Sequence, residues 1–103
     1  MQLIELQQIP SQEFNVVLDE QNCFIKIYQK DDKTFSSLSI DNKIIWQGML
    51  CHSFINLKPF NYLDFKGVLV FVDLFGKEDP DYTQYNTRFQ LLYMSEEEYA
   101  NLL

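Results

Sequence analysis

The sequence is poor in the residues from which most active sites are built. It has one histidine, His52, and two cysteines, Cys23 and Cys51. A structural zinc site takes about four Cys or His ligands, and serine catalysis with one histidine would need an elbow motif that is missing. The three glycines are isolated, which excludes phosphate-binding loops. We therefore expect a protein that is not an enzyme and has no metal, no cofactor and no small-molecule ligand.

Basic residues are also few. Eight Lys and Arg stand against 15 Asp and Glu, which gives a net charge of −7. Such a surface repels phosphate, so we expect no nucleic-acid binding. No apolar run approaches the ~20 residues that span a bilayer, and "MQLIELQQIP" lacks the pattern of a signal peptide. We expect no membrane association, synthesis in the cytosol, and two buried free thiols.

With only three Gly and three Pro among 103 residues, the chain is not a disordered or low-complexity sequence. Its length predicts a single β-rich domain over residues 1–103. Period-two alternation predicts strands in "EFNVVLD", "NCFIKIYQK", "TFSSLSI" and "KIIWQGML". Short polar turns separate these segments, so residues 13–50 are predicted to form a four-stranded meander.

The segment "CHSFINLKPFNYLDFKG" has no regular period and predicts a long irregular connection. We expect it to pack Phe54, Leu57, Phe60, Tyr62 and Leu63 onto the sheet, and its aromatic residues have an alternative interpretation as a contact surface. A connection of this length is often functional.

Two further strands and a helix complete the chain. "VLVFVDLF" predicts a central strand covered on both faces, or a strand in a subunit contact. "TRFQLLYM" is expected to place Phe89, Leu91 and Tyr93 on one face. "SEEEYANLL" predicts a short helix opened by a capping box of Ser95 and Glu98. The fold class is mainly β, a small antiparallel sandwich or partly open barrel of six to seven strands with a C-terminal helix.

The acidic segment "FGKEDPDY" allows two interpretations. Glu78, Asp79 and Asp81, with His52, could form a metal or acid/base site. However, Pro80 makes Asp79 extended, and successive residues then point in different directions. Aspartate and proline are ordinary turn residues, so we favour a loop between two strands.

Read in order, "IPSQEFNVVLDEQNCFIKI", "DNKIIWQG", "LKPFNYLDFKGVLVFVD" and "EDPDYTQYNTRFQLLYMSEEEY" cover nearly the whole chain. In this order and spacing, the chain resembles the small baseplate plug family of contractile-tailed phages and prophages. Among its mild departures from the family pattern, Glu20 stands where Gly is common.

The resemblance implies a structural tail protein that is made in the host bacterial cytoplasm and lies in the virion baseplate. It would sit in the hub, close the tail channel, and contact other hub proteins and tail-tube proteins. Hub parts are commonly threefold, which points to a homotrimer. A small acidic β-domain that binds and inhibits a host protein is the alternative. We expect partner contacts at Phe54, Phe60, Tyr62, Phe65, Tyr82 and Tyr85, and a backbone-shaping role for Pro59, Asp79 and Pro80.

Overall fold

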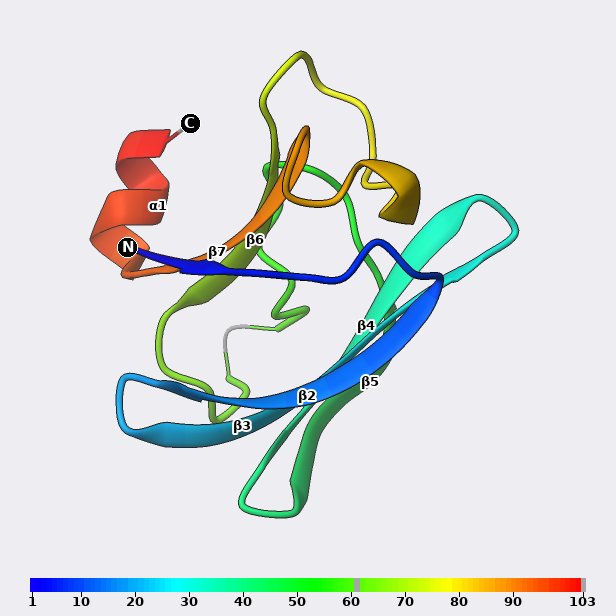
Figure 1. Cartoon of the computed structure of the whole chain (residues 1–103). Coiled ribbons are helices and arrows are strands. Elements are labelled where there is room, and N and C mark those ends of the chain that lie inside the picture. The colour runs from blue at the N-terminus through cyan, green and yellow to red at the C-terminus, as the bar shows by residue number, and fades with distance from the viewer. Residues whose placement is uncertain (61, 103) are drawn as a thin grey trace.

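Two-residue turns fold the first half of the chain into a four-stranded antiparallel sheet. The computed structural model describes residues 1–60 and 62–102. Both residues of each turn, at Asp19-Glu20, Asp31-Asp32 and Asp41-Asn42, have positive φ, as in type I′ hairpins. The predicted meander is therefore confirmed. In sheet order, its strands are β2 (Ser11–Leu18), β3 (Gln21–Lys30), β4 (Lys33–Ile40) and β5 (Lys43–Leu50) (Figure 1).

A second antiparallel sheet contains three strands. Its order is β1-β7-β6, so β7 lies in the middle and pairs with both neighbours. The sequence analysis did not predict β1, because three residues are too few to show an alternating pattern. The strands of this sheet are β1 (Gln2–Ile4), β6 (Val68–Asp73) and β7 (Phe89–Met94).

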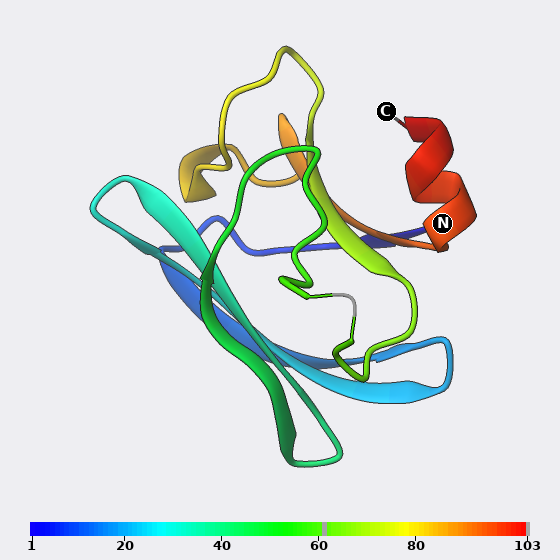
Figure 2. The same cartoon turned by 180° about the vertical axis from the view of Figure 1, so that it is seen from behind.

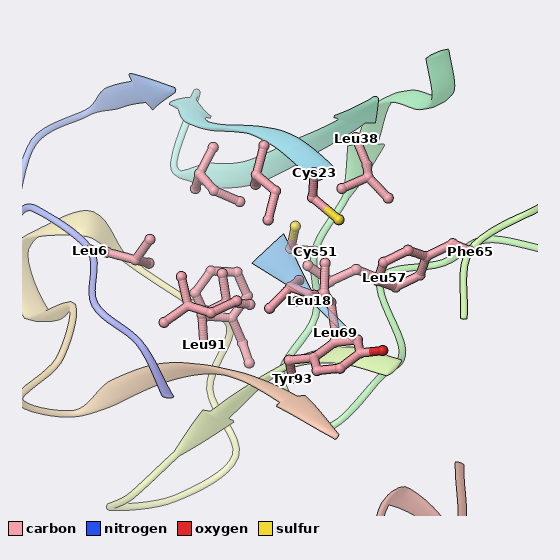
Figure 3. Close-up of a cluster of buried hydrophobic side chains, with 14 of the residues drawn as sticks. Leu6, Leu18, Cys23, Leu38, Cys51, Leu57, Phe65, Leu69, Leu91 and Tyr93 are labelled. Atoms are coloured by element: carbon pink, nitrogen blue, oxygen red, sulfur yellow. The ribbon is translucent and has the colours of Figure 1, made fainter. Parts of the chain in front are cut away.

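The main hydrophobic core lies between the two sheets (Figure 3). The four-stranded sheet contributes residues such as Leu18, Cys23 and Leu38, while Leu69 and Leu91 come from the three-stranded sheet. Phe89, Leu91 and Tyr93 share the core-facing side of β7, as predicted. Within the described residues the two sheets do not join into a closed barrel, which agrees with the predicted mainly-β fold.

Helix α1 (Glu96–Leu102) covers the other face of the three-stranded sheet. Tyr99 and Leu102 pack against a second apolar cluster that β6 and β7 supply. The predicted capping box is present: the Ser95 amide donates to Glu98 Oε1 at 2.9 Å, and the Glu98 amide donates to Ser95 Oγ at 3.1 Å. Among the described residues, no helix has the length and apolar character needed to cross a bilayer.

Strand β6 is buried along its whole length, as expected of a strand covered on both faces. The prediction of a central strand was wrong, because β6 lies at the edge of its sheet. In the connection between β5 and β6, residues 51–67, the part at 53–57 runs alongside this edge (Figure 2). The Phe54 amide donates to the Phe71 carbonyl at 2.7 Å, and the Leu57 amide donates to the Leu69 carbonyl at 2.8 Å. Two backbone carbonyls at the edge of β6 therefore accept hydrogen bonds from an irregular segment, in the place where a further strand could pair.

Candidate contact surface and acidic loop

Two aromatic rings stand exposed at a turn of the connection. Phe60 and Tyr62 are 53% and 81% exposed, and their rings stack with centroids 5.5 Å apart and planes 15° from parallel. The Leu63 amide donates to the Phe60 carbonyl at 3.2 Å, which closes the turn. The expectation that Phe60 and Tyr62 pack onto the sheet was therefore wrong. Each ring covers one face of the other and leaves the remaining faces open to a partner.

Other parts of the connection anchor this turn in the protein. Leu57 is buried, and Leu63 packs partly against the main core. The side chain of Lys58 is also buried, and its ammonium donates to the Phe65 carbonyl at 3.2 Å. A buried lysine before Pro59 was not predicted, because nothing in the local sequence distinguishes it from an exposed one.

Phe54 is half-buried and packs as part of the fold. It packs against the β6–β7 face that also carries α1, and the Tyr99 hydroxyl donates to its carbonyl at 3.0 Å. Its φ of +67° lies in the left-handed region, which is rare for a bulky residue. This conformation occurs between the two bridges that Ser53 and Asn56 make to β6.

Three further aromatic residues of the expected contact set lie at or inside the core. Phe65 is buried and meets Trp46 edge-on, with ring centroids 5.6 Å apart. Tyr85 is buried and stacks on Phe71. Tyr82 is half-buried against the same core. Burial thus removes Phe65 and Tyr85 from the surface that a partner can reach in this conformation.

An ion pair lies at the end of β6, just before the acidic segment. Asp73 is buried, and both of its oxygens bind Arg88, with Nε–Oδ1 at 2.7 Å and Nη2–Oδ2 at 2.8 Å. The same carboxylate accepts from the amides of Phe75 and Glu78, each at 2.9 Å. The Arg88 guanidinium lowers the pKa of Asp73 well below its usual range. Glu78 joins the pair through Arg88 Nη2 at 3.0 Å.

Asp79 and Asp81 have different partners. Asp79 Oδ2 lies 3.0 Å from His52 Nδ1, so the structure joins these two members of the metal or acid/base interpretation that we did not favour. Asp81 caps the short 3-10 helix η1 (Tyr82–Gln84) through the Thr83 amide and hydroxyl. The acids therefore diverge, and the described residues contain no group of three or more His, Cys, Asp or Glu placed to hold a metal.

The His52–Asp79 pair does not extend to a neighbouring nucleophile. The Ser53 hydroxyl donates to the Glu78 carbonyl at 2.6 Å instead of to His52. Cys51 is buried, while His52 is half-exposed. These contacts tie the start of the connection to the acidic loop, and Thr34 adds a buried hydrogen bond to the Pro80 carbonyl at 2.8 Å. These hydrogen bonds account for the position of the acidic residues as parts of a folded loop.

A hollow in the described surface lies between α1 and the end of the connection. It measures about 670 Å³ and its walls include Phe65, Tyr93 and Met94. The charges at its rim are paired: the N-terminal ammonium lies 3.2 Å from Glu98, and Lys66 lies 3.1 Å from Asp19. This pairing leaves little unbalanced charge to attract a ligand.

Comparison with known proteins gives one family. The model described as "Cyanophage baseplate Pam3 plug gp18" matches residues 1–97. No curated protein matches the chain. The matched region contains both sheets, the connection, the acidic loop and the first two residues of α1.

Proposed function

The chain belongs to the cyanophage baseplate Pam3 plug family, and on this basis we propose that it closes the tail channel from within the baseplate hub. A structural role in the tail baseplate, alongside other baseplate proteins, follows from the family itself. The finer proposal is a direct contact with hub and tail-tube proteins. No catalytic step is part of this role.

The observation that carries the contact proposal is the stacked pair of Phe60 and Tyr62. Large aromatic residues that remain exposed on a small domain dominate interface energetics once a partner buries them. Nearby Leu57 and Lys58 are buried, so the segment that leads to these rings is fixed in the protein. We assign this turn the role of the main anchor.

The charge of the chain fits a position at the end of a channel that DNA passes. A net charge of −7 repels the phosphate backbone, so the plug would not adhere to DNA. The proposed loop-shaping residues agree with this role as structural elements: Asp79 and Pro80 hold the loop through His52 and Thr34. The homotrimer expected from threefold tail hubs remains a prediction.

Co-expression tests the proposal. The chain would be produced with the hub and tail-tube proteins of its own phage, and complexes would be isolated through a tag on the partner. We expect retention of the wild type and loss of retention for the double variant Phe60→Ala, Tyr62→Ala. Phe75→Ala is the matched control, because Phe75 is an equally exposed aromatic residue on the acidic loop.

Two outcomes would contradict the proposal. One is a wild-type chain that forms no complex with any baseplate protein. The other is a chain that is absent from purified virions and instead captures a host protein, which would favour the host-inhibitor alternative. Thermal unfolding of each variant shows whether binding is lost because the contact surface has changed or because the protein no longer folds.

A further inference from the structure

Strand β2 forms an open edge of the four-stranded sheet (Figure 1). It pairs with β3 on one side only, in unbroken register along its whole length. In an antiparallel ladder, hydrogen-bonded pairs of residues alternate with pairs that are not hydrogen-bonded. The Gln29 amide donates to the Pro10 carbonyl at 2.8 Å, and the two-residue turn makes Leu18 and Gln21 a hydrogen-bonded pair. The backbone groups of the even-numbered residues of β2 therefore face β3, and those of the odd-numbered residues face the open side.

The outward backbone groups have no partner within the part of the chain that the structure describes. They belong to the exposed residues Ser11, Glu13, Asn15 and Val17. No described segment lies beside them to donate or accept hydrogen bonds. Unpaired amides and carbonyls along a strand form a template to which a further strand can add.

Among the described strands, the other three sheet edges are each unsuited to pairing. The β6 edge receives two backbone hydrogen bonds from the connection, and β1 is only three residues long. Strand β5 shifts register on both sides of Leu38, and its Gly48 has φ of +64°. Short strands, bulges, lysines and prolines are the devices that keep an edge from pairing. Strand β2 has no bulge, lysine or proline over its eight residues, so it is the long and regular edge that the fold leaves open.

We propose that β2 pairs with an extended segment of a baseplate protein, which adds to the sheet as a further strand. The segment carries apolar residues at alternate positions and a lysine or arginine opposite Glu13. The inference rests on the proposed function, because it describes how one of the baseplate partners is held. The contact is separate from the turn of Phe60 and Tyr62, which belongs to the connection.

The core-facing side of β2 requires the apolar residues of the segment. Phe14 and Val16 point from β2 toward the main core, but both are only half-buried at this edge. A strand added there places its side chains about 4.5–5.5 Å from theirs, Cβ to Cβ. Apolar residues at every second position of the segment would therefore complete this side of the core.

Charge selects a basic segment. Glu13 is the one charged residue of β2, and the chain has no Lys, Arg or His before Lys26. Lys26 neighbours Glu13 in the register, but its ammonium lies 5.4 Å from the centre of the Tyr28 ring. Within the described residues Glu13 forms no ion pair. A second copy would bring a strand whose one charge is again Glu13, so it cannot supply the opposite charge that a cross-strand pair favours.

Hydrogen exchange in the complex tests the added strand. The chain is produced with the hub and tail-tube proteins of its own phage, exchange is run in the complex, and the amides are read on the released chain after an acid quench. In the free chain, the amides of Glu13 and Asn15 should exchange fast, and those of Phe14 and Val16 slowly. In the complex, the amides of Glu13 and Asn15 should exchange about ten-fold more slowly or better, because each donates to the added strand.

Glu13→Lys tests the basic residue of the segment. Retention by a tagged partner should weaken about ten-fold or more, because like charges then face each other across the strands. Glu97→Lys is the matched control, since it makes the same change of charge at an exposed position of α1 and should leave retention unchanged. Asn15→Pro removes an outward amide that β3 does not use, and should also weaken retention. Circular dichroism confirms that the variants remain folded.

The outcomes separate this inference from the proposed function. If no complex forms with any baseplate protein, both fail. If a complex forms and the amides of Glu13 and Asn15 exchange as fast as in the free chain, only the added strand is overturned. Equal retention of Glu13→Lys and Glu97→Lys would overturn the basic segment. So would self-association of the chain alone that protects the same amides, because the occupant would then be a second copy.

Discussion

Arg88 and Asp73 are joined by two hydrogen bonds of 2.7 and 2.8 Å between their side chains. The pair connects the last residue of β6 to the residue before β7, and thus closes the acidic loop at its base. Of the acids that looked like a catalytic cluster in the sequence, Glu78 joins this structural ion pair, while Asp79 and Asp81 have partners of their own. Asp73 also accepts hydrogen bonds from the backbone amides of Phe75 and Glu78, and these bonds fix the first turn of the loop.

The ion pair predicts a loss of stability in acid. Arg88 lowers the pKa of Asp73 in the folded state, whereas in the unfolded state it is about 3.9. The contribution of Asp73 to stability is complete above that unfolded value and is lost as pH falls through the folded one. Urea unfolding between pH 5 and pH 2 should show a steeper decline for the wild type than for Asp73→Asn. Equal slopes would contradict the role of this pair.

The buried thiols predict a second loss at high pH. Burial raises the pKa of Cys51 to about 12 and that of Cys23 to about 11, against about 8.5 for a free thiol. The unfolded chain therefore loses these protons first, and stability that is complete below the unfolded pKa declines as pH rises through the folded values. Unfolding measured between pH 8 and 11 should show a smaller slope for Cys51→Ala than for the wild type, whatever the change at neutral pH.

Core and surface aromatics of the connection predict opposite responses to truncation. Phe65→Ala should lower the free energy of unfolding by about 3–5 kcal/mol, because it opens a cavity between Trp46 and Tyr93. Phe60→Ala should change it by less than about 0.5 kcal/mol, because Phe60 contacts solvent and Tyr62. Denaturant titration of the two variants checks the assignment. A large loss for Phe60→Ala would mean that its ring supports the fold.

The strands of the first sheet could be predicted because their signal is local. Alternation in β3 and the turns beside it lie within a few residues of each other. The site depends instead on contacts between distant parts of the chain. Gln21 exchanges two hydrogen bonds with the backbone of Lys66, and His52 meets Asp79, at separations of 45 and 27 residues. No local pattern encodes such pairs: the contact of Gln21 with Lys66 was not predicted, and His52 was grouped with Asp79 only in the interpretation that we did not favour.

Aromatic composition was equally uninformative about position. Phe60 and Phe65 lie five residues apart in the same irregular segment, yet one is exposed and the other is in the core. Without a period of two or 3.6, the sequence offers no rule that assigns each ring to a side. The edge position of β6 was missed because the whole strand is buried, although the connection adds only two backbone hydrogen bonds to its edge.

The turn at Asp19-Glu20 predicts a stabilising substitution. Glu20 has φ of +66°, a conformation that costs a residue with a side chain about 1–2 kcal/mol and costs glycine little. After the greater entropy of glycine in the unfolded chain is deducted, Glu20→Gly should raise the free energy of unfolding by about 0.5–1 kcal/mol. Glu13→Gly, within β2, is the matched control and should lower it. A loss for both variants would show that the Glu20 side chain makes a contact of its own.

At Gly67, by contrast, a substitution that adds a methyl group should destabilise the protein. Its φ is +94°, and a Cβ there would overlap the ring of Tyr93, with Cε1 only 2.6 Å away. The ring cannot withdraw freely, because the Tyr93 hydroxyl donates to the Lys66 carbonyl at 2.6 Å. Backbone strain and overpacking together should make Gly67→Ala cost about 2–4 kcal/mol.

Gly76→Ala is the control for this change, because its nearest neighbours lie 3.5 and 3.6 Å from the added carbon, and its unfolding should be close to that of the wild type. Tyr93→Phe removes the hydroxyl that the new methyl group meets first, so the double variant should lose less than the sum of the single losses. Chemical denaturation of the four proteins measures this coupling. Strict additivity would exclude the Tyr93 hydroxyl as the source of the strain and leave it to the retained ring or to the backbone of Gly67.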